Sequence, residues 1–168
     1  MAWRTVLRTA GLGVGNQLIA EVEAKLNELA QQDHRVRLLR TIPGVGPRLA
    51  ETLVAVIDDP RRFRRGKQVA SYVGLTPRRY QSGDMDRQGK ISGQGHKLLR
   101  TLLIEVSWLG LHHNPWMRAV YERALKSRSR KKIAIVAVAR RLLIRCWAML
   151  RDDRAWNQGT CLKLTRAA

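Results

Sequence analysis

Residues 71–100 read SYVGLTPRRYQSGDMDRQGKISGQGHKLLR and form the longest irregular run between strongly helical patterns. The run holds several glycines, a proline, many cations, and two hydroxyls beside glycine, those of Ser82 and Ser92. Loops held between helices are where binding and catalytic groups usually lie. We therefore interpret this run as the functional segment and the rest of the chain as its scaffold.

Apolar residues recur at three- and four-residue steps on both sides of the run, which is the spacing of an amphipathic helix. No alternating run of β-branched residues lies between turn signals, so we expect no strands and an all-α fold. Asn114 and Pro115 are a cap and a first helical residue. The expected helical segments are 16–33, 35–57 (two helices around a hairpin turn), 66–73, 95–109, the segment after Pro115, and 133–151 as the central core helix.

The expected organisation is a lead and helical arm (1–34), a helical domain (35–151) and a tail (152–168). The apolar stripe of the arm, from Leu18 to Ala30, could pack on its own domain or pair with a helix of a second copy, which would give a homo-oligomer. The cationic connector 126–132 is expected to stay extended until it meets a polyanion. In the tail, Trp156 could fold back on the core.

The charge balance indicates the partner. Thirty-two Lys and Arg residues against 13 Asp and Glu give a net charge of +19 in 168 residues. Such self-repulsion destabilises a compact state unless a polyanion relieves it, so nucleic acid is the expected partner. A membrane surface is not expected, because the cations are spread over several segments. No uncharged stretch of about 18 residues exists that could span a bilayer, so we expect a cytoplasmic, nucleoid-associated protein.

Residues 41–47 read TIPGVGP between two apolar helical patterns, which resembles a helix-hairpin-helix motif. Glycine permits close backbone approach, so the amides of Gly44, Val45 and Gly46 and the following helix N-terminus could bind a phosphate. Such a contact positions nucleic acid without reading sequence. The alternative is a tight turn between two packed helices.

Cations elsewhere could hold the phosphate backbone or simply form a solvated face. Those that we expect at nucleic acid are Arg48, Arg61, Arg62, Arg64, Arg65, Arg78, Arg79, Arg87, Lys90, Lys97, Arg100, Lys131 and Lys132.

Metal ligands are not evident. Asp58 and Asp59 precede Pro60 and are better explained as turn formers or as ion-pair partners of Arg61 and Arg62. His112 and His113 are adjacent, so they face apart on a helix and have no further ligand at metal spacing. Cys146 and Cys161 are too few for a disulfide framework or a zinc site.

Ser82 and Ser92 are the two candidate nucleophiles. Ser82 precedes Gly83, which leaves the approach to its hydroxyl open, and cations nearby in sequence could balance phosphate charge. Ser92 lies where a cap for the next helix is needed. The residues alone favour Ser82 only slightly.

Ordered motifs across residues 36–150 resemble the C-terminal domain of the insertion-sequence-110 transposase family. They are IPGVG (42–46), RF (62–63), GLTPRR (74–79), QSG (81–83), GKIS (89–92), LR (99–100) and KK (131–132). The resemblance implies a helical DNA-binding domain with Ser82 as catalytic serine and a guide (bridge) RNA as partner. It also implies an N-terminal RNase-H-like domain that binds a divalent metal through acidic residues and reaches the serine from a partner subunit.

Two departures limit this resemblance. The chain has Ser92-Gly93 where the family commonly has Ser-Lys, and nothing in it matches the acidic quartet, so no cofactor is expected in this chain. The main hypothesis is thus a truncated DNA transposase domain that transfers phosphoryl groups through Ser82. The alternative is a non-catalytic basic helix-hairpin-helix module or gene remnant that binds nucleic acid. A general RNA-binding protein would explain the charge but not the motif spacing.

Overall fold

The computed structural model describes residues 17–22, 24–25, 27–28, 30–82, 85–128 and 130–157. The chain forms two compact units, Met1–His34 and Arg35–Ala168. In the first unit, the described residues between 17 and 32 are helical, and Leu18, Ile19 and Val22 are exposed. None of the helices in the described ranges is both long and apolar enough to cross a lipid bilayer.

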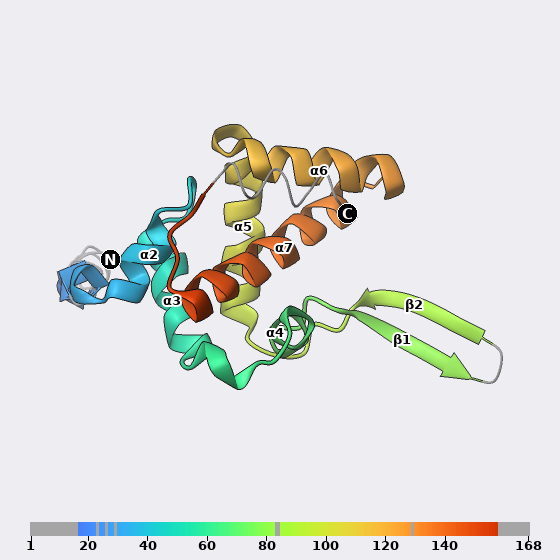
Figure 1. Ribbon diagram of the computed structural model, residues 1–168, viewed down its shortest axis with the longest axis horizontal. Helices are drawn as coiled ribbons and strands as arrows, with labels where there is room; N and C mark the ends of the chain where they lie inside the picture. The colour runs from blue at the N-terminus through green and yellow to red at the C-terminus, as the bar shows by residue number, and fades with distance from the viewer. Residues whose placement is uncertain are drawn as a thin grey trace, which may run out of the picture. The chain divides into compact units, whose positions relative to one another are not determined.

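The second unit is a cluster of helices with one β-hairpin (Figure 1). This confirms the all-α class, although the prediction that strands are absent is wrong. In chain order the elements are α2 (His34–Arg40), α3 (Pro47–Ile57), the 3-10 turn η1 (Pro60–Arg62), α4 (Gly66–Tyr72), β1 (Pro77–Ser82), β2 (Met85–Ile91), α5 (Lys97–His113), α6 (Pro115–Arg128) and α7 (Lys131–Asp152).

Helix α7 is the core of this unit, as its apolar sequence predicts. Its Ala134, Val138, Leu142 and Cys146 are completely buried, and α4, α5, α6 and η1 all pack against it. Burial raises the pKa of the Cys146 thiol to about 12, because a thiolate would lose its hydration there. The connector prediction is wrong: residues 126–128 continue α6 and Lys131 and Lys132 begin α7, so most of the segment is helical.

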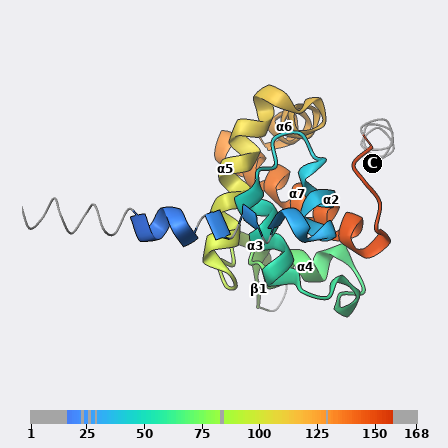
Figure 2. The ribbon, with the colours of Figure 1, turned by 90° about the vertical axis from the view of Figure 1, so that its left-hand side faces the viewer.

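Helix α5 joins the two ends of the unit, with α4 and the hairpin near its start and α6 at its end (Figures 1 and 2). Asn114 turns the chain from α5 into α6. Its Oδ1 accepts the amides of Trp116 and Met117 at 3.1 and 3.4 Å, so the predicted cap is confirmed. Its Nδ2 donates to the carbonyl of Pro43 at 3.1 Å and so ties this corner to the turn between α2 and α3.

That turn packs closely on the end of α5. Gly44 has φ of +91°, and a Cβ there would lie 3.5 Å from the Cα of Gly110. The Val45 side chain is buried, and its amide donates to the carbonyl of Ile42 at 3.0 Å. The turn is therefore part of the packing between α2, α3 and α5.

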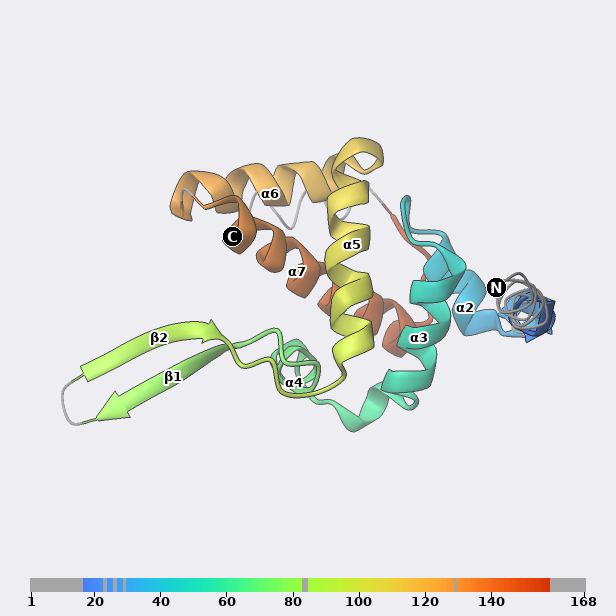
Figure 3. The same cartoon turned by 180° about the vertical axis from the view of Figure 1, so that it is seen from behind.

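The hairpin lies within the run interpreted from sequence as irregular (Figure 3). β1 and β2 are antiparallel, with Ser82 opposite Met85 and a register shift between Pro77 and Arg79. Its strands lack the alternating apolar face on which strand prediction depends. The remaining signal was the Gly83-Asp84 pair, a sequence typical of two-residue hairpin loops, which itself lies outside the described residues.

The segment after α7 folds back on the core, as expected for Trp156. The Trp156 amide donates to Thr41 Oγ1 at 3.1 Å, and its indole lies edge-on to Trp116 with ring centroids 5.3 Å apart. The guanidinium carbon of Arg145 lies 5.7 Å from the Trp156 ring centroid.

Candidate nucleic-acid interface

Ser82 is the last residue of β1, and its side chain is exposed. The end of β1 lies far from the helices (Figure 3). The pairing of Gln81 with Asp86 and of Ser82 with Met85 closes the ribbon there. The hydroxyl is therefore open to a partner as large as a nucleic-acid backbone.

The cations close to Ser82 in sequence are spread along the hairpin. Arg79 pairs with Gln88 and Tyr80 with Arg87, so both arginines belong to its middle, although their side chains lie outside the described part of the structure. Arg78 and Lys90 lie at the base, beside the Pro77–Ile91 pair. At about 3.3 Å per residue, the backbone of Arg78 is about 13 Å from that of Ser82. Sequence proximity alone thus does not place these two cations around the hydroxyl.

The neck of the hairpin, which we define as residues 73–76 and 92–96, is held by hydrogen bonds. The Ser92 amide donates to the carbonyl of Thr76 at 2.7 Å, and the Arg78 guanidinium donates to the Ser92 carbonyl through Nε at 3.3 Å and Nη2 at 3.0 Å. Arg100, in the first turn of α5, donates from Nη1 to the carbonyl of Val73 at 3.0 Å. Both guanidinium groups thus serve contacts within the chain.

The prediction that Ser92 caps α5 is wrong. The helix starts at Lys97, and the cap is His96, whose Nδ1 accepts the Leu99 amide at 3.2 Å. Ser92 instead contributes its backbone amide and carbonyl to the hydrogen bonds of the neck. The signal that could have found the cap is position, since His96 lies two residues before Leu98, the first of the regularly spaced apolar residues of the helix.

The arginines before α4 divide into two kinds. Arg62 is engaged within the chain: its guanidinium carbon lies 4.6 Å from the centroid of Phe63 and 4.7 Å from that of Tyr72, and its Nη2 donates to Val56. The side chains of Arg61, Arg64 and Arg65 are exposed. Asp59 accepts the amide of Arg61 at 2.9 Å, which confirms its prediction as a turn former.

The turn between α2 and α3 is distant from the neck. Gly44 lies beside Gly110 at the end of α5, whereas Lys97 starts that helix thirteen residues earlier. At about 1.5 Å per residue, the two regions are about 20 Å apart along α5. The expectation of three free amides is also wrong, because Val45 already donates to Ile42; Gly44 and Gly46 remain exposed.

The other predicted cations are exposed but separate. Arg48 lies in the first turn of α3, Lys97 starts α5, and Lys131 and Lys132 start α7. The segment that carries Arg61, Arg64 and Arg65 contacts the end of α4 through the rings of Phe63 and Tyr72, whose centroids lie 5.5 Å apart, and Lys97 directly follows the neck.

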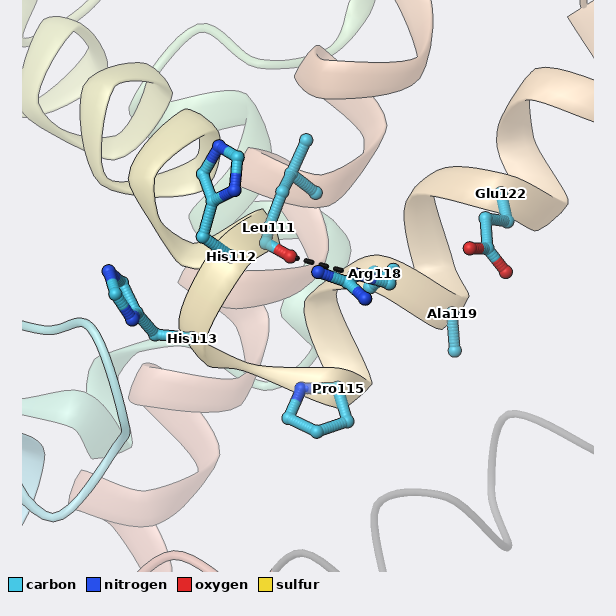
Figure 4. Close-up of a pocket in the computed structure, with 7 residues that line it drawn as sticks. All are labelled: Leu111, His112, His113, Pro115, Arg118, Ala119 and Glu122. Carbon is cyan, nitrogen blue, oxygen red and sulfur yellow. Dashed lines mark hydrogen bonds between the residues drawn. The ribbon is translucent and has the colours of Figure 1, made fainter.

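A shallow hollow of about 200 Å³ lies at the corner between α5 and α6 (Figure 4). The His112 and His113 rings lie 6.4 Å apart, and Glu122 is on the far side of Arg118. In the ranges that the structure describes, no three His, Cys, Asp or Glu side chains come together as metal ligands, so those residues do not fit a divalent cation. The hollow is lined by Leu111, His112, His113, Pro115, Arg118, Ala119 and Glu122.

Comparison with known proteins shows which family the chain resembles in the region of the hairpin. A model of the "Transposase IS116/IS110/IS902 family" matches residues 36–122, a range that includes α3, the neck and the whole hairpin. The chain is 32% identical over 144 residues to the pilin gene-inverting protein of Moraxella bovis, which covers 84% of this chain and 45% of that protein. It is 31% identical to a probable family 20 transposase of Pseudomonas aeruginosa, over 84% of this chain and 43% of that protein.

A third relative is the transposase for insertion sequence element IS1111A of Coxiella burnetii, 30% identical over 86% of this chain and 40% of that protein. The chain thus spans less than half the length of each of these relatives. The family model covers most of α2, then α3 to α5 with the hairpin, and the first part of α6, and not an isolated motif. The chain belongs to the IS116/IS110/IS902 transposase family.

Proposed function

We propose that this chain acts on DNA as the serine-bearing part of a transposase, with Ser82 as the nucleophile. The observation that carries the proposal is the exposed hydroxyl of Ser82 at the end of a hairpin that extends from the helical body. A nucleophile for DNA has to reach a phosphodiester within a large, rigid duplex. A projecting ribbon can reach it without burying the helices against the DNA.

The proposed step exchanges one phosphodiester for another. Ser82 Oγ attacks the phosphorus, forms a new P–O bond and gives up its proton, while the bond to one deoxyribose oxygen breaks and that oxygen takes up a proton. The serine–DNA diester conserves the bond free energy for rejoining. Charge on the phosphoryl oxygens needs stabilisation by cations, and Arg79 and Arg87 are the closest along the ribbon.

The exposed cations are proposed to hold the DNA backbone. Arg61, Arg64, Arg65 and Lys97 are exposed near the base of the hairpin, and the chain carries a net charge of +19. Contacts of this type release counterions, so the affinity falls steeply with salt. Gly44 and Gly46 are proposed as a second contact, at the far end of α5.

The partners implied by the family remain proposals for this chain. They are a metal-binding acidic domain, a guide RNA and a second subunit. A divalent metal would lower the negative charge at the phosphate when bound, but the described residues of this chain offer no ligand set for it.

A trapping experiment tests the assignment of Ser82. Duplex DNA with a bridging phosphorothiolate at the cleavage position releases a thiolate that needs no proton and cannot rejoin, so a serine adduct accumulates. We expect an adduct, mapped by mass spectrometry to the peptide containing Ser82, for the wild type and for Ser92→Ala but not for Ser82→Ala. Ser92 is the matched control, because its hydrogen bonds at the neck use its backbone.

An adduct that survives Ser82→Ala would refute the assignment. Binding that depends on salt but gives no adduct with the wild type, even after addition of the N-terminal domain of a relative, would favour the second candidate, a non-catalytic binding module. That candidate is favoured by one observation, the net charge of +19, which nucleic-acid binding alone would explain.

A further inference from the structure

We propose that Arg78 and Arg100 are positioning residues, which lock the neck and thereby fix the direction in which the hairpin presents Ser82. Neither guanidinium is expected to bind DNA. The catalytic consequence of this inference rests on the proposed function of Ser82, but the mechanical part does not.

The described residues of the hairpin have no buried side chains that would hold it against the helices. Among its residues with described side chains, none is buried, and Gln81, Ser82, Gly89 and Lys90 are exposed. A lone two-stranded hairpin is only marginally stable in water and needs packing against other elements to hold a position. Its orientation must therefore be set where it joins the helices.

The two chain segments of the neck cross at a distance that only glycine allows. Gly74 has φ of +80°, and a Cβ there would collide with the carbonyl oxygen of Gln94. Gly95 has φ of +102°, and a Cβ there would collide with the carbonyl oxygen of Tyr72. The Gly93 amide also donates to the carbonyl of Gly74 at 3.3 Å.

Two arginines from different elements add hydrogen bonds to this crossing. Arg78 belongs to β1 and binds the carbonyl of Ser92, so it holds the outgoing strand to the returning one. Arg100 belongs to α5 and binds the carbonyl of Val73, so it holds the outgoing segment to a helix that packs on α7. Hydrogen bonds from a charged donor are stronger than neutral ones. Together these bonds connect the hairpin to the core helices.

The length of the hairpin makes this connection important. Ser82 is five residues beyond Pro77 along β1, or about 17 Å at about 3.3 Å per residue. A rotation of about 10° at the neck would move the Ser82 backbone by about 3 Å. A misplacement of about 1 Å can reduce a reaction rate by about 100-fold, so a loosened neck should slow adduct formation at least about 10-fold.

Two measurements separate a positioning role from a DNA contact. The first is a distance distribution between spin labels at Gln81→Cys and Thr101→Cys, both exposed sites, in a Cys161→Ser background; Cys146 is completely buried. We expect one narrow distribution for the parent and a broad one for Arg78→Gln and Arg100→Gln. The second is the salt dependence of duplex binding, whose slope should stay that of the parent in both variants.

Arg64→Gln is the matched control, since the Arg64 side chain is exposed near the same end of the unit. Loss of one phosphate contact lowers the slope of log K against log salt by about 0.9. We expect Arg64→Gln to lower the slope and leave the label distance unchanged, the reverse of the neck variants. At saturating DNA, the neck variants should form the adduct at least about 10-fold more slowly with an unchanged Kd.

The inference is overturned if the double variant Arg78→Gln/Arg100→Gln keeps the narrow distance distribution, or if either single variant lowers the salt slope. Far-UV circular dichroism identifies a variant that fails to fold, and Arg78→Gln, on the exposed side of the neck, then carries the test alone. If Ser82 is not the nucleophile, no adduct depends on it, yet the distance and salt results still decide whether the arginines lock the neck.

Discussion

Replacing Asn114 by alanine should strongly destabilise the second unit. The side chain is almost completely buried, accepts hydrogen bonds from two backbone amides at the start of α6 and donates one to the carbonyl of Pro43. Loss of such a cap costs about 1 to 2 kcal/mol. Loss of the bond to Pro43 adds about 1 kcal/mol, so the free energy of unfolding should fall by about 2 to 3 kcal/mol.

Asn114→Ser divides this sum into its two parts. Serine caps helices about as well as asparagine, but it is too short to reach Pro43, so we expect a loss of about 1 kcal/mol. Asn27→Ala, an exposed substitution in the N-terminal unit, should change stability by less than about 0.5 kcal/mol.

Urea unfolding followed by circular dichroism measures these differences, and hydrogen exchange shows where they act. Asn114→Ala and Asn114→Ser should both speed amide exchange in residues 44–46, because both lose the bond to the turn. A loss below about 0.5 kcal/mol for Asn114→Ala, or equal losses for the alanine and serine variants, would refute this account of the corner.

Three further predictions follow from packing. Gly74→Ala should lower the free energy of unfolding by more than about 1 to 2 kcal/mol, because Gly74 has a positive φ and a Cβ there would collide with Gln94. Gly46→Ala should cost little, because Gly46 has a φ of −84° and open space around it, and thermal unfolding compares the two variants. Trp156→Ala should cost about 1 to 2 kcal/mol through its contacts with Trp116 and Arg145, measured by urea unfolding; an unchanged midpoint would contradict the packing of the tail. Burial raises the folded-state pKa of the Cys146 thiol from its ordinary value near 9 to about 12, so the stability that this group contributes is full below pH 9 and is lost as the pH rises towards 12. At pH 8 its peptide should be alkylated by iodoacetamide only after unfolding, and rapid labelling of the native protein would show that the thiol is accessible.

The helical part of the fold could be predicted because burial leaves a periodic record in the sequence. The core residues of α7 and the Asn114-Pro115 start of α6 are examples. The hairpin leaves no such record, since a ribbon without a buried face has no apolar alternation, and its residues appeared to be a loop. Ser82 was nevertheless found as an exposed hydroxyl, because that prediction required only chemistry and a neighbouring glycine.

The grouping of cations could not be predicted for a different reason. Arg62, Arg78 and Arg100 have the same charge as Arg64, and only the structure shows that the first three are used against aromatic rings and carbonyl groups within the chain. Their neighbours decide their role, and these lie up to 27 residues away in sequence.

The two-stranded sheet has one further consequence, for the behaviour of the protein without its partner. Among the residues that the structure describes, each strand pairs only with the other, so both outer edges of the hairpin offer unpaired main-chain donors and acceptors that could template a strand from another molecule. Pro77 in β1 has no amide hydrogen to donate to an added strand. Lys90 in β2 carries a positive charge that repels the same strand of another copy. The same basic residues that suit the ribbon to a polyanion therefore also keep it from fibril-like self-association, and concentrated salt weakens that protection.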